Sequence, residues 1–181
     1  MIHLIATLDT SVLDYLYSIR SFPATIFFIA VSEFGREIIV FLIVIVLALW
    51  YVYRKQFADV FGLIVSVFGT ATTILILKYA ISRPRPGFWF QAYPEGPFYS
   101  FPSAHAGLSI ALYGFLIYLL LQTYPTAFRR VAIAILPLLI FLIGFSRLYL
   151  GVHYFSDVIA GYVVGVFFIW LGIQLRLRFL G

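Results

Sequence analysis

Apolar residues along this 181-residue chain occur in long continuous runs that are separated by short polar segments. Five runs predict membrane-spanning helices, at about residues 38–53, 57–81, 104–124, 131–145 and 154–175. The strands of an outer-membrane barrel would instead alternate apolar and polar residues over about ten positions. We therefore expect an all-α fold, a polytopic transmembrane helical bundle with five spans.

The first 36 residues follow a different pattern. Residues 10–20 place their apolar side chains on one helical face, and residues 24–32 are apolar but too few to cross a bilayer. We interpret residues 1–36 as an amphipathic segment that lies in the interface or re-enters it. Residues 37–181 then form the core of a single membrane-embedded domain. The alternative is a short sixth span, and we expect no cleaved signal peptide because no basic stretch precedes an apolar run.

Composition supports the membrane assignment. Hydrophobic residues make up 64% of the chain and charged residues 10%, whereas a soluble domain has about 45–50% apolar and about 25% charged residues. The aromatic share of 20% excludes disorder. The chain contains no cysteine, which excludes disulfides and thiol catalysis. The net charge of +5 is explained by basic cytoplasmic loops or an anionic ligand, so we expect no nucleic-acid partner.

The few polar side chains of the apolar region gather at one face of the predicted bundle. Ionisable groups at the ends of spans are costly and usually functional. Any single one has an ordinary structural explanation, such as a lysine that reaches to the interface, but a whole set on one face indicates a site. The set consists of Lys78, Arg85, Ser103, His105, Arg147, His153 and Asp157.

The chemistry of this set indicates phosphoryl transfer. His153 and Asp157 are spaced i, i+4 on one predicted helix, so the carboxylate can hold one imidazole nitrogen and leave the other as a nucleophile or base. His105 follows Pro102 and Ser103 at a predicted helix start, where free backbone N–H groups suit an anion. The three cations supply more charge than a carboxylate needs, and arginine suits phosphate. They would also repel a zinc ion from the histidines, so we expect no metal and no other cofactor.

Three sequence blocks resemble the signature of the type-2 phosphatidic acid phosphatase superfamily. Residues 78–86, KYAISRPRP, fit the pattern K-x6-R-P, and residues 146–157, SRLYLGVHYFSD, fit S-R-x5-H-x3-D. Residues 102–105 read PSAH, where the family has P-S-G-H, so Ala104 replaces the usual glycine. The blocks come in the family's order. The chain is therefore similar to the membrane lipid phosphatases of that superfamily.

The resemblance implies a role for each residue of the set. His153 resembles the nucleophile that attacks phosphorus, Asp157 the residue that orients it, and His105 the general acid that protonates the leaving oxygen. Arg83 also precedes a proline, but its spacing from the lysine does not fit the family pattern. The implied phosphate-binding residues are Lys78, Arg85, Ser103, Ala104 and Arg147.

These inferences predict an integral-membrane lipid phosphatase that hydrolyses a lipid phosphate or diphosphate through a phosphohistidine, without metal. Candidate substrates are undecaprenyl diphosphate, phosphatidylglycerol phosphate, phosphatidate and lipid A 1-phosphate. We expect the aromatic-rich loop from Phe88 to Tyr99 and the gaps between the spans to select the headgroup. A phosphotransferase that uses the same site is an alternative. A transporter of anions or lipid phosphates is another, but it leaves the pair of His153 and Asp157 unexplained.

The distribution of basic residues predicts the orientation. Six lie on the face opposite the site, and three remain on the site's own face once the three ligand-binding cations are discounted. Short loops rich in Lys and Arg stay in the cytoplasm, so we place the protein in the inner (plasma) membrane with its site outside the cytoplasm. The six residues of the cytoplasmic face are Arg54, Lys55, Arg129, Arg130, Arg176 and Arg178.

Gly161 and Gly165 form a G-x-x-x-G pattern in the last predicted span. Such a pattern can mark the face of a homodimer. We favour close packing inside the bundle over that interpretation.

Overall fold

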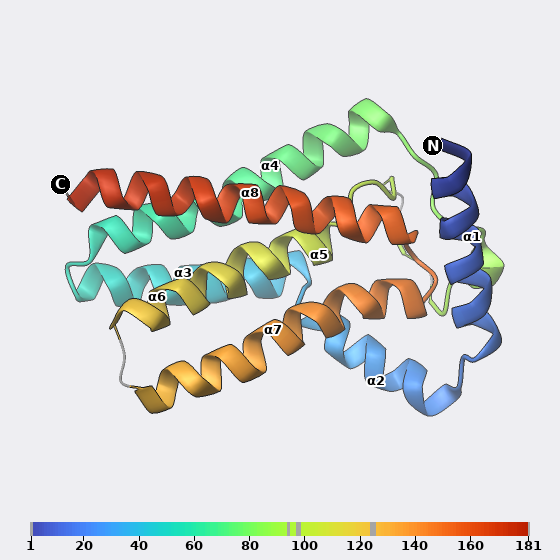
Figure 1. The fold of residues 1–181 in the computed structure, drawn as a ribbon, viewed down its shortest axis with the longest axis horizontal. Helices are drawn as coiled ribbons and strands as arrows, with labels where there is room; N and C mark the ends of the chain where they lie inside the picture. Colours follow the sequence, from blue (N-terminus) through green and yellow to red (C-terminus); the bar gives the residue numbers. More distant parts are fainter. Residues whose placement is uncertain (1, 94, 97–98, 124–125, 181) are drawn as a thin grey trace.

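The computed structural model describes residues 2–93, 95–96, 99–123 and 126–180, which form helices and loops and no strand. This confirms the all-α prediction (Figure 1). The elements in chain order are α1 (Ile2–Ser18), α2 (Phe22–Glu33), α3 (Glu37–Tyr53), α4 (Phe57–Ile81), η1 (Phe88–Phe90), α5 (Ala104–Ser109), η2 (Ile110–Gly114), α6 (Phe115–Thr123), α7 (Thr126–Tyr149) and α8 (Phe155–Leu180).

Within the described residues, four helical segments are long and apolar enough to cross a membrane, at Phe57–Ile81, Ala104–Gln122, Phe128–Tyr149 and Phe155–Leu180. The pair α2 and α3 passes the same test together but is bent by 41°, so up to five spans are present. The boundary predicted between residues 36 and 37 falls on this bend. The placement of residues 1–36 in the interface stays a prediction.

Two of the predicted spans differ at their ends, those that correspond to α7 and α8, and α8 continues to Leu180 rather than ending at residue 175. The end expected at residue 124 lies outside the described residues. Helix α7 begins at Thr126 rather than at residue 131, and it ends at Tyr149 rather than at residue 145. Arg129 and Arg130 did not end the helix because arginine is a good helix former and both side chains are exposed.

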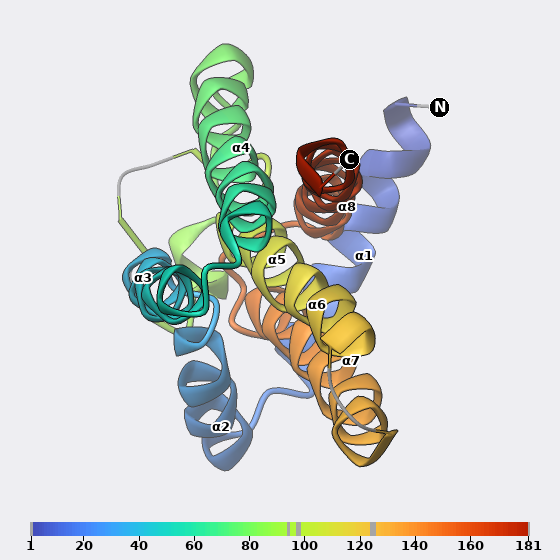
Figure 2. The same ribbon diagram turned by 90° about the vertical axis from the view of Figure 1, so that its left-hand side faces the viewer.

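Helices α5 and α6, joined through the π-helical turn η2, form the centre of the bundle. Figure 2 shows α3, α4, α7 and α8 arranged around this axis. Gly161 and Gly165 lie on the side of α8 that faces α5. A Cβ atom on Gly161 would stand 2.5 Å from the Ser103 carbonyl oxygen, and one on Gly165 would stand 2.7 Å from the Gly107 carbonyl oxygen. Both glycines therefore serve close packing within the chain.

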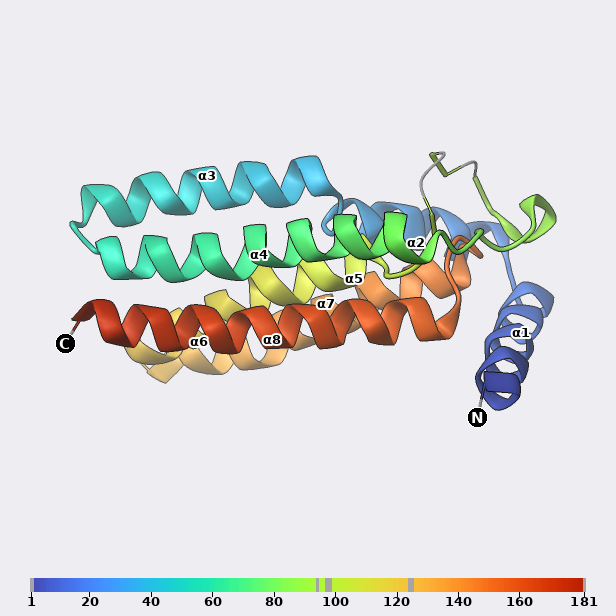
Figure 3. The same ribbon diagram turned by 90° about the horizontal axis from the view of Figure 1, so that it is seen from above.

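The two ends of the bundle differ. The loops at residues 82–93, 99–103 and 150–154 lie together at the end of the bundle that α1 crosses (Figures 1 and 3). The opposite end holds the C-terminus and the turn between α3 and α4. There, Arg176 forms an ion pair with Asp59 and donates to the hydroxyl of Tyr118, so this arginine ties α8 to α4 and α6.

Candidate active site

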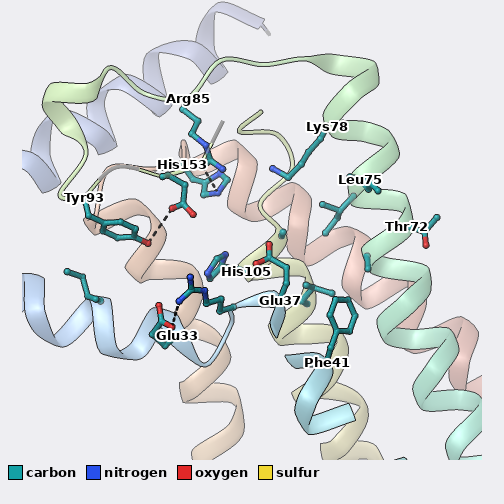
Figure 4. Close-up of a pocket in the computed structure, with 18 residues that line it drawn as sticks. Glu33, Glu37, Phe41, Thr72, Leu75, Lys78, Arg85, Tyr93, His105 and His153 are labelled. Atoms are coloured by element: carbon teal, nitrogen blue, oxygen red, sulfur yellow. Dashed lines mark hydrogen bonds and ion pairs between the residues drawn. The ribbon is translucent and has the colours of Figure 1, made fainter. Parts of the chain in front are cut away.

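All eight residues predicted for the site lie at the end that α1 crosses, around one pocket of about 800 Å³. Five of them line the pocket: Lys78, Arg85, Ala104, His105 and His153. The other three, Ser103, Arg147 and Asp157, are fully buried in its walls. Figure 4 shows the two imidazoles and the lysine pointing into the same space from three different segments.

His153 sits in the short loop between α7 and α8, and not on one helix with Asp157 as expected. Helix α8 begins only at Phe155, and Asp157 lies in its first turn. The carboxylate accepts a hydrogen bond from the backbone N–H of Tyr154 at 2.9 Å, which satisfies a donor that the helix start leaves free. The loop that carries His153 passes close to this carboxylate, so the Nδ1 atom of His153 still lies 3.4 Å from Oδ2 of Asp157.

The second ring nitrogen of His153 lies at the pocket, where it accepts from Arg85 when the ring carries its proton on Nδ1. Its Nε2 lies 3.2 Å from a guanidinium nitrogen of Arg85, and the ring lines the pocket. Burial, followed by the positive charges of Arg147, Arg85 and Lys78, lowers the pKa of His153 well below its usual 6.5. The imidazole is therefore neutral near pH 7 and keeps a lone pair that faces the pocket.

The cations reach the pocket from three segments, each held by neighbouring oxygens. Lys78, in the last turn of α4, donates to the carbonyl oxygen of Tyr99. Arg85 donates to the carbonyl oxygen of Val152 at 3.0 Å. These contacts place both side chains beside His153 without neutralising their charge.

Arg147 is the most deeply placed cation, with no exposed surface. One of its terminal nitrogens donates to the Ser32 hydroxyl and, at 2.7 Å, to the Tyr93 hydroxyl. The other forms an ion pair with the carboxylate of Glu95. A carboxylate of the loop therefore occupies the position beside Arg147 where the resemblance places a phosphate oxygen.

Two buried polar atoms have no hydrogen-bond partner within the described part of the chain, Nε of Arg147 and Oγ of Ser103. Buried polar atoms are nearly always paired. Ser103 directly precedes α5, whose first turn contains Ala104 and His105 at the pocket wall. An anion with several oxygens would give partners to unsatisfied donors at this end of the pocket. Among the described residues, no group of three or more His, Asp or Glu side chains is arranged to hold a metal ion.

Several pocket residues were not predicted. Tyr93 and Glu95 come from the loop, and Glu33, Arg36 and Glu37 come from the bend between α2 and α3. The signal for the second group was present in the sequence, since three charges fall within five residues of an otherwise apolar segment. The sequence could not reveal that these residues contact the pocket, because that contact depends on how α2 packs against α7 and turns into α3.

Arg83 was set aside as a phosphate ligand, and it does not line the pocket. It instead donates to Oδ1 of Asp157 at 2.7 Å and to Oδ2 of Asp9, on α1, at 2.8 Å. No local sequence pattern indicates this link, since Asp9 and Asp157 lie 148 positions apart.

The fold defines a polytopic helical membrane protein, and its pocket places two imidazoles, Lys78 and Arg85 beside the buried side chains of Asp157 and Arg147. The chain belongs to the PAP2 superfamily, whose family model matches residues 59–180. This match confirms the resemblance that the three sequence blocks predicted.

Curated relatives are similar over most of the chain. Phosphatidylglycerophosphatase B of Bacillus subtilis (strain 168) is 33% identical over 133 residues, which cover 72% of this chain and 64% of that protein. Lipid A 4'-phosphatase of Bacteroides thetaiotaomicron is 28% identical over an alignment of 187 positions, gaps included, which covers 94% of this chain and 78% of that protein. The chain spans between 49% and 64% of the length of the first three curated relatives it matches.

Solved structures share the fold. The transmembrane PAP2 type phosphatidylglycerolphosphate phosphatase from Bacillus subtilis superposes with a TM-score of 0.87 at 22% identity, over 97% of this chain and 87% of that one. Aquifex aeolicus LpxE superposes with a TM-score of 0.72 at 23% identity, over 92% and 95%. At these sequence identities, the structural similarity shows that the helices are arranged in the same fold.

Proposed function

We propose that this chain is an integral-membrane lipid phosphatase that works through a phosphohistidine on His153. The observation that carries the proposal is the placement of that ring. One nitrogen faces a buried carboxylate, and the other faces a pocket that three cations line or adjoin. Such an arrangement activates a neutral nucleophile and stabilises the charge of a phosphoryl group.

The reaction follows from the positions of the side chains. The lone pair on Nε2 of His153 forms a bond to phosphorus as the bond from phosphorus to the lipid oxygen breaks. Lys78, Arg85 and Arg147 stabilise the non-bridging oxygens. His105 gives a proton to the leaving oxygen and then takes one from the water that hydrolyses the phosphohistidine. Asp157 keeps the proton of the nucleophile on Nδ1.

The pocket supports a lipid as the substrate. Beyond the cations its wall is apolar and is formed by Phe41 on α3 and by Ala71, Ile74 and Leu75 on α4 (Figure 4). An acyl or prenyl chain can lie along this wall while its phosphate meets the imidazoles. The names of the relatives favour phosphatidylglycerol phosphate first and a lipid A phosphate second.

The orientation is part of the proposal. The pocket lies at the end of the bundle opposite Arg54, Lys55 and the C-terminal arginines of α8. The basic end belongs in the cytoplasm. The site then opens outside the cytoplasm, toward the outer leaflet of the plasma membrane.

The decisive experiment is a panel of lipid phosphates given to the purified protein in detergent, with EDTA present. We expect release of inorganic phosphate from at least one lipid, fastest from phosphatidylglycerol phosphate, and no release by the His153→Ala variant. Transfer of the phosphoryl group to a second lipid, with no free phosphate, would indicate a phosphotransferase. Turnover of none of the lipids would refute the proposal.

A further inference from the structure

A buried chain of polar side chains joins α1 to the site. Asp9 is only 2% exposed, although most of α1 is exposed. Its Oδ1 accepts from the backbone N–H of Ser156 at 2.8 Å, and its Oδ2 accepts from the hydroxyl of Ser156 at 2.6 Å. A buried carboxylate is costly unless it is paired. Asp9 therefore fixes α1 against the first turn of α8.

Arg83 connects this carboxylate to the one beside the nucleophile. Its Nη2 donates to Asp9 at 2.8 Å, and its Nη1 donates to Oδ1 of Asp157 and to Oγ of Ser156, both at 2.7 Å. The face of the guanidinium lies over the ring of Tyr154, 4.1 Å from its centroid. A planar guanidinium that is bonded at both ends and stacked on a ring has a single orientation.

The link decides how Asp157 faces His153. Arg83 occupies Oδ1 of the carboxylate, which leaves Oδ2 for the backbone N–H of Tyr154 and for the imidazole. The distance of 3.4 Å between Oδ2 and Nδ1 is long for a hydrogen bond. A modest rotation of the carboxylate would therefore break its contact with the ring. Arg83 opposes this rotation, together with the side chain of Ser100 and the backbone N–H of Tyr154, which also bond to the carboxylate.

We propose that Arg83 and Asp9 are positioning residues, and that the seating of α1 against α8 sets the orientation of His153 through Asp157. The proposal rests on the proposed function of His153 as the nucleophile. Arg83 does not line the pocket, and it acts on the reaction only through the carboxylate.

Substitution of Arg83 tests the link. Arg83→Met removes the charge and all three hydrogen bonds, and we expect kcat to fall about 10–100-fold, the scale seen when a partner of a site residue is lost. The KM for the lipid and the inhibition constant of inorganic phosphate should change little, because the phosphate-binding side chains are intact. Arg83→Lys should recover part of kcat, since lysine restores the charge but not the two guanidinium nitrogens that donate to Asp157 and to Asp9. Asp9→Asn should lower kcat less than Arg83→Met.

A double-mutant cycle separates this role from a general effect on folding. If Arg83 acts through Asp157, then Arg83→Met should cost little further activity in a protein that already carries Asp157→Asn. Losses that multiply across the two substitutions would overturn the proposal.

Arg20→Met is the matched control. Arg20 lies at the same end of the bundle, and its guanidinium donates to the backbone carbonyl of Tyr149 at 3.1 and 2.7 Å rather than to a side chain of the site. We expect this substitution to lower the melting temperature while kcat stays close to that of the wild type. Equal losses of kcat in Arg20→Met and Arg83→Met, in step with their melting temperatures, would overturn the positioning role.

A readout without substrate keeps the two proposals apart. The ¹⁵N spectrum of the His153 ring, assigned by its absence in His153→Asn, reports which nitrogen carries the proton. We expect an Nδ1-protonated ring in the wild type and loss of that state in Arg83→Met. A wild type that is inactive on every lipid but shows this change would refute the proposed function and support the positioning role. An active wild type whose ring and kcat do not respond to Arg83→Met would refute the positioning role alone.

Discussion

The pH dependence of the reaction depends on the environment of His153. Burial and the nearby positive charges of Arg147, Arg85 and Lys78 lower its pKa well below 6.5. Protonation destroys the nucleophile, so the acid limb of kcat/KM should lie below pH 6.5 and activity should persist in mildly acidic solution. Arg85→Gln removes one of these charges, which raises the pKa of His153 and moves the limb to higher pH. An acid limb at or above pH 6.5 in the wild type would contradict this assignment.

His105 should matter in proportion to how poor the leaving group is. A general acid contributes roughly 10²–10⁴-fold, and a lipid alkoxide needs its proton much more than an activated aryl phosphate does. We expect His105→Ala to reduce turnover of the lipid strongly and turnover of para-nitrophenyl phosphate weakly. The ratio of the two rates, wild type against variant, is the measurement. Equal losses would mean that His105 only positions the phosphate.

Glu95 competes with the phosphate in the proposed site. Its carboxylate is paired with Arg147, and a substrate phosphate must displace it to reach this arginine. Glu95→Gln keeps the shape but removes the charge, so both the KM for the lipid and the inhibition constant of inorganic phosphate should fall. Steady-state kinetics with added phosphate measure both quantities. A rise in both constants would show that Glu95 helps to form the binding site.

The residues of the site divide into those that sequence could reveal and those that it could not. His105, His153 and Asp157 stand out because ionisable groups are rare in apolar segments and because their spacing is informative. Asp9 and Arg83 have no such signal. Their role depends on α1 crossing the end of the bundle, and this is a tertiary contact that no local pattern encodes.

At the scale of elements, the contact between α5 and α8 positions the start of the central helix. A Cβ on Gly161 would stand 2.5 Å from the backbone carbonyl of Ser103, so Gly161→Ala must move α8 or the segment that carries Ala104 and His105. Overpacking costs about 1–3 kcal/mol, and we expect a loss of both stability and kcat. Gly114→Ala is the control, because its Cβ would meet the flexible end of the Ile169 side chain, at 2.6 Å. Thermal unfolding and kcat of the two variants compare the sites, and equal behaviour would contradict the role given to Gly161.

The elements themselves were predictable where a run of apolar residues has a charged or proline-rich boundary. The predicted spans at residues 38–53 and 57–81 agree closely with α3 and α4. The bend between α2 and α3 and the π-helical turn η2 were not predicted. An apolar run indicates that a helix is buried or in lipid, but it does not encode the direction in which that helix continues.

At the scale of the whole molecule, the topology can be tested directly because the chain has no native cysteine. Phe88 is 82% exposed at the site end, and Thr126 is exposed at the start of α7, toward the other end. We expect Phe88→Cys to react with a membrane-impermeant thiol reagent in intact cells. Thr126→Cys should react only after the membrane is opened. The reverse pattern would place the site in the cytoplasm and its substrate in the inner leaflet.

The same labelling decides the position of α1. Asp9 on this helix is bonded to Ser156 and Arg83, so α1 must lie at the same end of the bundle as the site. Thr10, the next residue, is exposed, and Thr10→Cys should therefore be labelled from outside together with Phe88→Cys. Labelling of Thr10→Cys only in opened cells would mean that residues 1–36 cross the membrane as a sixth span. In that case α1 could not remain bonded to the start of α8, and the kcat of Asp9→Asn should then equal that of the wild type.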